Sequence, residues 1–370
     1  MTEILVVTWD GGGNVPPALL IATELRRRGH GVRVLGHETQ RDAVTAAGLP
    51  FRGYPTAAAF SSIEENSPAR MMSLFSDRTI GADTVVEAGR APTDVVLVDC
   101  LLIGALRACA VAGLTYVSLE HLYDGYLRGG WLNGPMGLAA RARRLQPARS
   151  WGNAARALAV TLPELDPGSG GRSRPENLVF TGPVLDLPAA HDLASHEPAI
   201  LVSLSTYLFP EMARSLQNIL DATAALDARV VVTTGPAVDP ADLRTAANHE
   251  VHRFVPHDEL MPQVSLVIGH GGHATTMRAL AHDLPLVVIP MHPLLDQPMV
   301  GRSLVAAGAG RLVPKKSRPA ALTPVITEML GDGPHRAAAA RLGARIREMR
   351  GTETAADRVL AAVGSVAKAP

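Results

Sequence analysis

The chain has 370 residues, 47% of them hydrophobic and 19% charged, so it is long enough and apolar enough for two domains with buried cores. Its 35 Lys and Arg residues balance 35 Asp and Glu residues, and this neutrality argues against an extended basic surface for nucleic acid or an anionic membrane. The N-terminus enters a strand pattern without a basic leader, and no apolar run reaches membrane-spanning length, so we expect a cytoplasmic protein. Cys100 and Cys109 have no metal-type spacing and are expected to be reduced, buried thiols.

The first half of the chain alternates short apolar runs with helical patterns. The expected strands are residues 4–8, 32–36 and 94–99, and the expected helices are residues 17–28 and 40–47. Continuous apolar strands between helices are typical of a parallel sheet covered on both faces. Two stretches lack periodicity: residues 123–135 are expected to be irregular, and residues 166–175 to form an exposed loop.

The second half repeats the alternation more regularly. Its expected strands are residues 199–203, 229–234, 251–255, 266–269 and 286–290. Helices are expected to begin near Pro210, Pro240, Asp258, Ala274 and Asp296, and amphipathic helices to occupy residues 334–349 and 352–363.

These patterns predict an α/β protein made of two doubly wound, Rossmann-like parallel-sheet domains. The expected parts are an N-terminal domain at 1–184, a linker at 185–198, a C-terminal domain at 199–350, and a final helix at 351–370 that packs back on the N-terminal domain. Open parallel sheets bind ligands beyond the carboxyl ends of their strands, so the two sheets are expected to face a central cleft.

One strand-to-helix turn carries the strongest chemical signal. The strand at residues 266–269 runs into His270-Gly271-Gly272, and a helix opens near Ala274. Glycines permit a tight turn and close backbone approach, and a helix N-terminus offers N–H groups to an anion, with the Thr275 hydroxyl and His270 beside them. This predicts a diphosphate site built without a metal; the plainer alternative is a tight turn with a satisfied histidine. Zinc binding by His270 and His273 is disfavoured, because no carboxylate or cysteine lies at a usual spacing.

The same segment resembles the donor-site signature of the GT-B glycosyltransferases that decorate antibiotics, macrolides and other natural products. That signature is a strand, His-Gly-Gly-x-Gly-Thr, an Ala-Leu helix, a Gly-x-Pro strand and an Asp-Gln pair. The matching positions here are His270–Thr275, Ala279-Leu280, Pro285 and Asp296-Gln297, with Val255-Pro256-His257 upstream and Gly308-Ala309-Gly310 downstream. The chain departs from the pattern at Ala274, where the family usually has glycine.

The resemblance implies that the C-terminal domain binds a nucleotide sugar and the N-terminal domain binds the acceptor. Asp296 and Gln297 would hold the sugar hydroxyls, although alone they could equally form a helix N-cap pair. The remaining implied donor-binding residues are Ser205, Thr206, Val255, His270, Gly271, Gly272, His273, Ala274 and Thr275. For Ser205 and Thr206, a Ser-rich turn that caps the next helix is the alternative.

The catalytic base does not follow the family pattern. The family writes Gly-His-Val-x-Pro after the first strand and uses that histidine to deprotonate the acceptor, but this chain has Asn14 in its place. An amide cannot act as a general base at neutral pH. The candidate replacements are Asp99, Asp10 and His121; an acceptor that needs no base is a further alternative.

Aromatic residues suggest where a lipophilic acceptor could bind. Residues 123–136 would form an acceptor wall, with Trp131 as the best single contact. The candidate acceptor-binding residues are Trp9, Phe75, Tyr123, Tyr126 and Trp131; each could instead pack the domain core.

The resemblance therefore implies an inverting, metal-independent transfer of a sugar, a deoxyhexose by preference, to a small lipophilic natural-product acceptor. The donor would be a TDP-sugar in preference to a UDP-sugar, and no cofactor is expected. The main alternative is a catalytically silent nucleotide-binding helper protein of the same fold. An oxidoreductase is disfavoured, because Pro16 prevents a Gly-x-Gly-x-x-Gly motif after Asp10; a nucleotide-sugar epimerase or cell-wall transferase is a further alternative within the fold.

Overall fold

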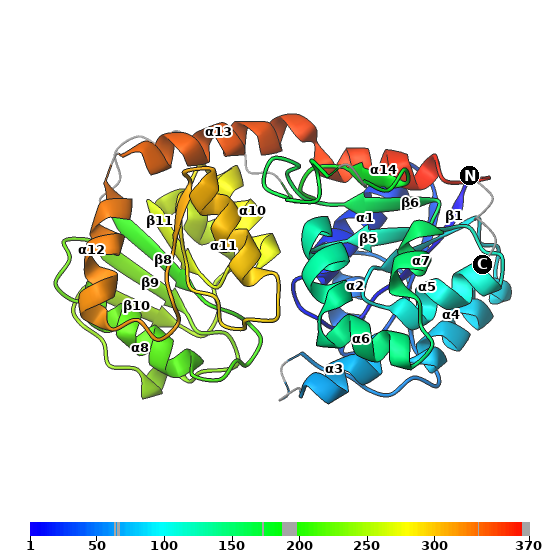
Figure 1. Cartoon of the computed structure of the whole chain (residues 1–370), viewed down its shortest axis with the longest axis horizontal. Coiled ribbons are helices and arrows are strands. Elements are labelled where there is room, and N and C mark those ends of the chain that lie inside the picture. Colours follow the sequence, from blue (N-terminus) through cyan, green and yellow to red (C-terminus); the bar gives the residue numbers. More distant parts are fainter. Residues whose placement is uncertain (63, 65–66, 172–173, 187–197, 332, 365–370) are drawn as a thin grey trace. The chain divides into compact units, whose positions relative to one another are not determined.

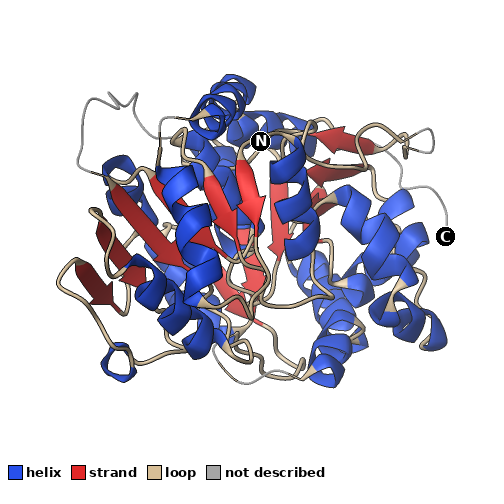
Figure 2. Cartoon of the chain, turned by 60° about the vertical axis from the view of Figure 1, so that its left-hand side comes forward, coloured by secondary structure: helices blue, strands red, loops and turns tan. Residues whose placement is uncertain are grey.

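The computed structural model describes residues 1–62, 64, 67–171, 174–186, 198–331 and 333–364. The chain forms two compact units, which are Met1–Asp186 with Met349–Pro370, and Leu187–Glu348. Each unit is a parallel sheet between layers of helices (Figures 1 and 2). Most of the expected linker, residues 187–197, lies outside the described residues.

The N-terminal unit holds a seven-stranded parallel sheet in the order β3-β2-β1-β4-β5-β6-β7. Its strands are β1 (Glu3–Val7), β2 (Gly31–Gly36), β3 (Phe51–Gly53), β4 (Val95–Asp99), β5 (Tyr116–Glu120), β6 (Arg156–Ala159) and β7 (Leu178–Phe180). The strand order changes direction between β1 and β4, where Val7 pairs with Val98. In a doubly wound sheet this switch point is where the carboxyl ends of strands leave room for a ligand.

Eight α-helices of the N-terminal unit are α1 (Val15–Arg27), α2 (Arg41–Ala46), α3 (Pro68–Phe75), α4 (Arg78–Arg90), α5 (Ile103–Val111), α6 (Pro135–Ala142), α7 (Pro147–Gly152) and α14 (Gly351–Leu360). The last helix returns from the far end of the chain and shares a core with α1. Ala355 and Val359 are buried in the same cluster as Ile21 and Leu25. A buried apolar face of this kind, and not helix propensity alone, stabilises so short a helix.

The C-terminal unit holds a six-stranded parallel sheet in the order β10-β9-β8-β11-β12-β13. Its strands are β8 (Ala199–Ser203), β9 (Arg229–Thr233), β10 (His249–His252), β11 (Leu266–Gly269), β12 (Leu286–Val288) and β13 (Gly310–Leu312). Its helices are α8 (Met212–Thr223), α9 (His257–Leu260), α10 (His273–Ala281), α11 (Gln297–Ala306), α12 (Pro319–Leu330) and α13 (Pro334–Met349). The central strands β8 and β11 pair from Leu266–Ile200 to Gly269–Ser203, which brings their carboxyl ends side by side.

Several expectations were wrong in detail. The helix expected near Pro240 is only the 3₁₀ turn Pro240–Asp242: the Asp239 side chain caps its start through the Ala241 N–H, but the chain becomes extended at Leu243. The strand expected at residues 251–255 begins at His249 and ends at His252.

The stretch at residues 123–135, expected to be irregular, contains the π-helix Tyr126–Trp131. Asp166 anchors its approach, since its carboxylate accepts the N–H groups of Asp124 at 2.6 Å and Gly125 at 2.9 Å. Asp166 was expected in an exposed loop, but it is only 2% exposed. These two segments, separate in the sequence, therefore fold as one local structure.

Among the described residues, no helix has both the length and the apolar character that crossing a bilayer requires.

Candidate active site

Two of the three candidate bases meet at the switch point of the N-terminal sheet. Asp99 is the last residue of β4, and His121 follows β5, the neighbouring strand. The His121 Nε2 atom lies 3.2 Å from Asp99 Oδ2 and 3.4 Å from Oδ1. Both residues are buried, with 3% and 8% of their surfaces exposed, so the pair is a desolvated imidazole–carboxylate dyad.

Asn14 joins this dyad through its amide. Its Nδ2 atom donates to Asp99 Oδ2 at 2.8 Å and to the Trp9 carbonyl at 3.0 Å, while its Oδ1 accepts the Gly11 N–H at 3.1 Å. These contacts fix which end of the amide faces the carboxylate. The residue that replaces the expected histidine therefore orients Asp99 and cannot take a proton.

The environment keeps Asp99 ionised. Burial alone would raise the pKa of Asp99, but the His121 charge and hydrogen bonds from His121, the Leu101 N–H and Asn14 outweigh it, so the pKa falls below its ordinary value. An ionised carboxylate beside an imidazole holds one tautomer and stabilises the imidazolium that forms when the ring accepts a proton. The arrangement can therefore serve as a general base.

Asp10 is not part of the dyad. Its carboxylate accepts the Ser62 N–H at 3.4 Å and the Ser62 hydroxyl at 3.2 Å. These bonds tie the loop after β1 to the loop that contains Ser62, which gives Asp10 a structural role.

Glu120, a residue that the sequence did not single out, lies next to His121 at the end of β5. It is fully buried, and burial, together with Asp124 and Asp166, raises its pKa to about 8 despite the nearby Arg128 guanidinium. Arg128 Nη2 lies 3.3 Å from Glu120 Oε1. In the sequence, the only sign that Glu120 belongs to this site was its position directly before the candidate base His121.

The expected acceptor residues are all buried. Trp9 is 4% exposed, Phe75 3%, Tyr123 0%, Tyr126 6% and Trp131 4%. They fall into separate groups. The Trp9 and Phe75 rings pack edge to face with their centroids 5.3 Å apart, and the Trp131 and Trp151 rings do so with their centroids 5.6 Å apart.

Within these groups, Trp131 and Trp9 differ in their polar atoms and neighbours. Trp131 serves the core of the N-terminal unit, because its partner Trp151 is 0% exposed and donates its indole N–H to the Cys100 carbonyl. Trp9 adjoins the dyad through Asn14, and its buried indole N–H has no partner among the described residues. A buried donor without a partner is costly, so Trp9 is the better candidate for contact with a ligand.

The turn from β11 to α10 has the geometry expected of an anion site. Gly271 has φ +82°, and a Cβ there would lie 2.8 Å from Val288 Cγ1 and 3.0 Å from the Gln297 carbonyl, so only glycine fits. Gly272 is the N-cap of α10 and provides no side-chain cap, and Thr275 is half-buried in the first turn. The N–H groups at the start of this helix are therefore not capped by a side chain.

His270 lies beside this helix start. Part of the residue reaches the surface, yet burial of its ring and the charge of His257 lower its pKa to about 4, so the imidazole is neutral at pH 7. Its Nδ1 atom has no hydrogen-bond partner among the described residues. His257 belongs to the sequence motif but was given no role there. Its Nε2 atom lies 3.1 Å from Ser203 Oγ.

Asp296 and Gln297 stand at the start of α11. Asp296 occupies the N-cap position, but its side chain makes no capping hydrogen bond, and only 4% of the residue is exposed. Gln297 Oε1 accepts the N–H groups of Met291 at 2.8 Å and His292 at 3.1 Å, so this amide shapes the loop after β12. Asp296 thus has the position of an N-cap residue, but its side chain does not make the hydrogen bond that a cap would make.

Other expected donor residues lie in loops at the same edge of the C-terminal sheet. Ser205 Oγ accepts the Tyr207 N–H at 2.8 Å and lies seven residues before α8 begins at Met212, so it shapes a turn and does not cap that helix. Thr206 is exposed. Among the described residues, no hydrogen bond engages the Val255 backbone, which leaves its N–H and carbonyl for a nucleobase edge.

Apolar side chains surround these loops. Phe254 is 74% exposed and Leu294 53%, and they follow β10 and β12 respectively. Exposed apolar residues gathered at the ligand edge of a sheet are typical of a binding surface.

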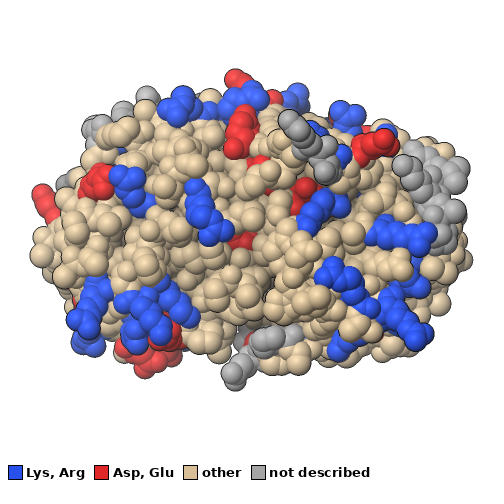
Figure 3. All heavy atoms as spheres, in the orientation of Figure 1, with Lys and Arg blue, Asp and Glu red and all other residues tan. Residues whose placement is uncertain are grey.

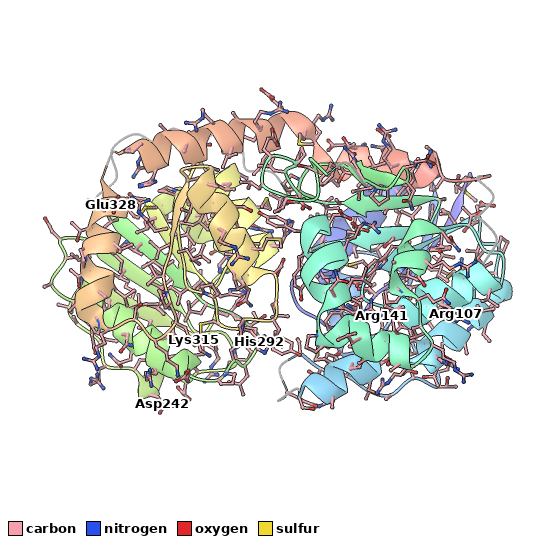
Figure 4. The ribbon with its side chains drawn as sticks, viewed as in Figure 1. Arg107, Arg141, Asp242, His292, Lys315 and Glu328 are labelled. Atoms are coloured by element: carbon pink, nitrogen blue, oxygen red, sulfur yellow. The ribbon has the colours of Figure 1, made fainter. Side chains whose placement is uncertain are left out.

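Lys315 and His292 lie at the loop after β12. Lys315 Nζ lies 3.4 Å from the Met291 carbonyl, and burial together with the Lys315 charge lowers the pKa of His292 (Figure 4). Elsewhere, charged side chains are scattered over a mostly uncharged surface in the view of Figure 3.

Comparison with known proteins agrees with this geometry. Residues 217–357 match the family described as erythromycin biosynthesis protein CIII-like, C-terminal domain. The uncharacterized UDP-glucosyltransferase YojK of Bacillus subtilis (strain 168) is 23% identical over 98% of each chain. The demethyllactenocin mycarosyltransferase of Streptomyces fradiae is 24% identical over 96% of this chain and 86% of its own. The solved structure of the kitacinnamycin glycosyltransferase superposes with a TM-score of 0.81 at 22% identity, covering 98% of this chain and 99% of that one.

The two Rossmann-like parallel-sheet units have the GT-B fold, and the chain is a glycosyltransferase. The match to the erythromycin biosynthesis protein CIII-like, C-terminal domain covers much of the C-terminal unit and continues into α14. This assignment takes the place of the helper-protein and oxidoreductase alternatives.

Proposed function

We propose that the chain transfers a deoxyhexose from a TDP-sugar, in preference to a UDP-sugar, to a small lipophilic natural-product acceptor, with inversion and without a metal cofactor. The observation that carries the donor half is the β11–α10 turn, where His270, the glycine-only turn and a helix start without a side-chain cap converge. The preference for TDP is supported by the glycosyltransferase VinC, solved in complex with dTDP, which shares the fold with a TM-score of 0.72 at 20% identity.

The donor residues have distinct roles in this proposal. The neutral His270 ring and the first-turn N–H groups of α10 hydrogen-bond the diphosphate, and they stabilise the charge that grows on it as it leaves. Asp296, at the N-cap position of α11, accepts hydrogen bonds from the sugar hydroxyls. The Val255 backbone pairs with the nucleobase.

The dyad supplies the base. The acceptor oxygen attacks the anomeric carbon, the bond from that carbon to the phosphate oxygen breaks, and the acceptor's proton passes to His121. Because Nε2–H donates to Asp99 in this arrangement, the basic lone pair of the ring is on Nδ1. Asp99 then stabilises the imidazolium, and Asn14 keeps the carboxylate in place.

Calorimetric titration with dTDP and with UDP in EDTA tests the donor half. We expect metal-free binding, tighter for dTDP, that His270→Ala weakens by about tenfold or more, the loss of one strong hydrogen bond to a charged group. His252→Ala is the matched control, since His252 is exposed at the end of β10. Absence of binding by either nucleotide at millimolar concentration, or equal losses in the two variants, would contradict the donor site.

A further inference from the structure

Cys100 extends the dyad into a three-residue cluster. One ligand atom each from Asp99, Cys100 and His121 lies within 4.8 Å of the other two. All three residues are buried, Cys100 completely. No other His, Cys, Asp and Glu group among the described residues meets the same criterion.

The three atoms match the coordination chemistry of zinc. A carboxylate oxygen, a cysteine sulfur and an imidazole nitrogen are all ligands that Zn²⁺ accepts in tetrahedral geometry. With Zn–N and Zn–O bonds of about 2.0 Å, the edge of such a tetrahedron is about 3.3 Å long. The distances from His121 Nε2 to the two Asp99 oxygens are 3.2 Å and 3.4 Å, so these two side chains already stand one edge apart.

The surroundings hold the ligands in position. Asn14 Nδ2 and the Leu101 N–H each donate to one oxygen of Asp99, at 2.8 Å and 2.9 Å. The Cys100 carbonyl accepts the Trp151 indole N–H at 2.8 Å, which fixes the backbone that carries the thiol. Outer hydrogen bonds of this kind orient metal ligands and strengthen metal binding.

We propose that Asp99, Cys100 and His121 bind Zn²⁺, or a divalent cation of similar affinity for sulfur, and that the bound ion switches the enzyme off. On binding, the Cys100 thiol loses its proton to solvent and binds as thiolate, whereas the neutral His121 ring keeps one proton, now on Nδ1, and directs its Nε2 lone pair to the metal. Three protein ligands leave the fourth position to water. The ion ties up the imidazole and carboxylate that deprotonate the acceptor. The inhibition rests on the proposed function, whereas the binding does not.

Cobalt spectroscopy tests the binding without any substrate. Co²⁺ is added to the full-length protein after EDTA treatment and buffer exchange, and the thiolate-to-cobalt absorption band is recorded. We expect one Co²⁺ per chain in the wild type and in Cys109→Ser, whose thiol is equally buried but lies outside the cluster. The band should vanish in Cys100→Ser, and the His121→Asn variant should bind Co²⁺ at least about tenfold more weakly.

Two results would overturn the site: no thiolate band in the wild type, or a band that persists in Cys100→Ser. Circular dichroism checks that each variant is folded, and Cys100→Ala replaces Cys100→Ser if the hydroxyl prevents folding. The ratio of transfer activity with and without Zn²⁺ then tests inhibition, which we expect in the wild type and Cys109→Ser but not in the Cys100 variant. Cobalt binding without any transfer activity would refute the proposed function alone, and transfer activity without a cobalt band would refute the metal site alone.

Discussion

The Asn14 amide nitrogen lies 2.8 Å from Asp99 Oδ2, at the position where the resemblance to natural-product glycosyltransferases implies a histidine base. The carboxylate thus keeps a side-chain donor on one side, but that donor cannot accept a proton at neutral pH. An imidazole is supplied instead from the next strand, by His121 at 3.2 Å from the same oxygen. The proposed base has therefore moved from the loop after β1 to the end of β5.

Removal of either member of the dyad should affect chemistry and not donor binding. We expect Asp99→Asn and His121→Gln each to lower kcat by about 10²- to 10⁴-fold, the usual contribution of general base catalysis. Nucleotide Kd should stay within about twofold, because the donor residues belong to the other unit. Asp10→Asn is the control and should retain near wild-type kcat; a large loss there with an active Asp99→Asn would assign the base to Asp10.

Asn14 should act as a positioning residue. Asn14→Ala removes the donor to Asp99, and we expect kcat to fall by about tenfold, the cost of one hydrogen bond to a charged group. Asn14→Asp should be worse, because it brings a second carboxylate against Asp99 and so raises the pH at which the dyad becomes active. The pH profile of kcat separates the two variants; identical profiles would argue against this role.

Asp296 should contribute to binding of the donor's sugar and not to binding of its nucleotide. Asp296→Asn should weaken binding of the nucleotide sugar by about tenfold while leaving free nucleotide unaffected, since one charged hydrogen bond to a hydroxyl is lost. Asp242→Asn, a substitution of an exposed carboxylate in the same unit, serves as control. Parallel titrations with TDP-glucose and TDP measure both affinities; equal losses for the two ligands would mean that Asp296 only shapes the loop.

Gly271 should not tolerate a side chain. Gly271→Ala places a Cβ 2.8 Å from Val288 Cγ1 in a backbone with φ +82°, so we expect unfolding free energy to fall by about 1–3 kcal/mol. Nucleotide affinity should fall as well, because the turn positions the start of α10. Gly333→Ala, where a Cβ meets open space, should leave both quantities unchanged in denaturant and binding titrations.

Glu120 should make stability depend on pH. Its folded-state pKa is raised from 4.5 to about 8, so its contribution to stability is complete below pH 4.5 and is lost as the pH rises through about 8. Between those values the wild type should lose up to about 1.4 kcal/mol per pH unit relative to Glu120→Gln, which cannot ionise. Denaturant unfolding at pH 5 to 9 measures this difference. Exposed Glu259→Gln is the control, and parallel curves for wild type and Glu120→Gln would refute the shift.

The sequence alone determined much of the framework and the donor turn. The strands at residues 199–203 and 266–269 are confirmed to the residue as β8 and β11, because fully buried parallel strands read as continuous apolar runs. The anion-site geometry could also be predicted, since His270 to Thr275 are consecutive and a strand-to-helix turn is a local structure. The geometry of such a turn is set by consecutive residues and does not depend on contacts with distant parts of the chain.

Only the tertiary structure decided how the candidate catalytic groups assemble. Asp99 and His121 meet because β4 and β5 pair in parallel, with Asp99 opposite Leu119, and no periodicity in the sequence specifies that register. The same holds for the burial of Trp131 against Trp151, which comes from helix packing, and for the approach of Cys100 to His121. Local sequence patterns encode each strand and its buried faces, whereas the pairing of strands, and so the chemistry at their ends, is fixed by long-range packing of the whole sheet.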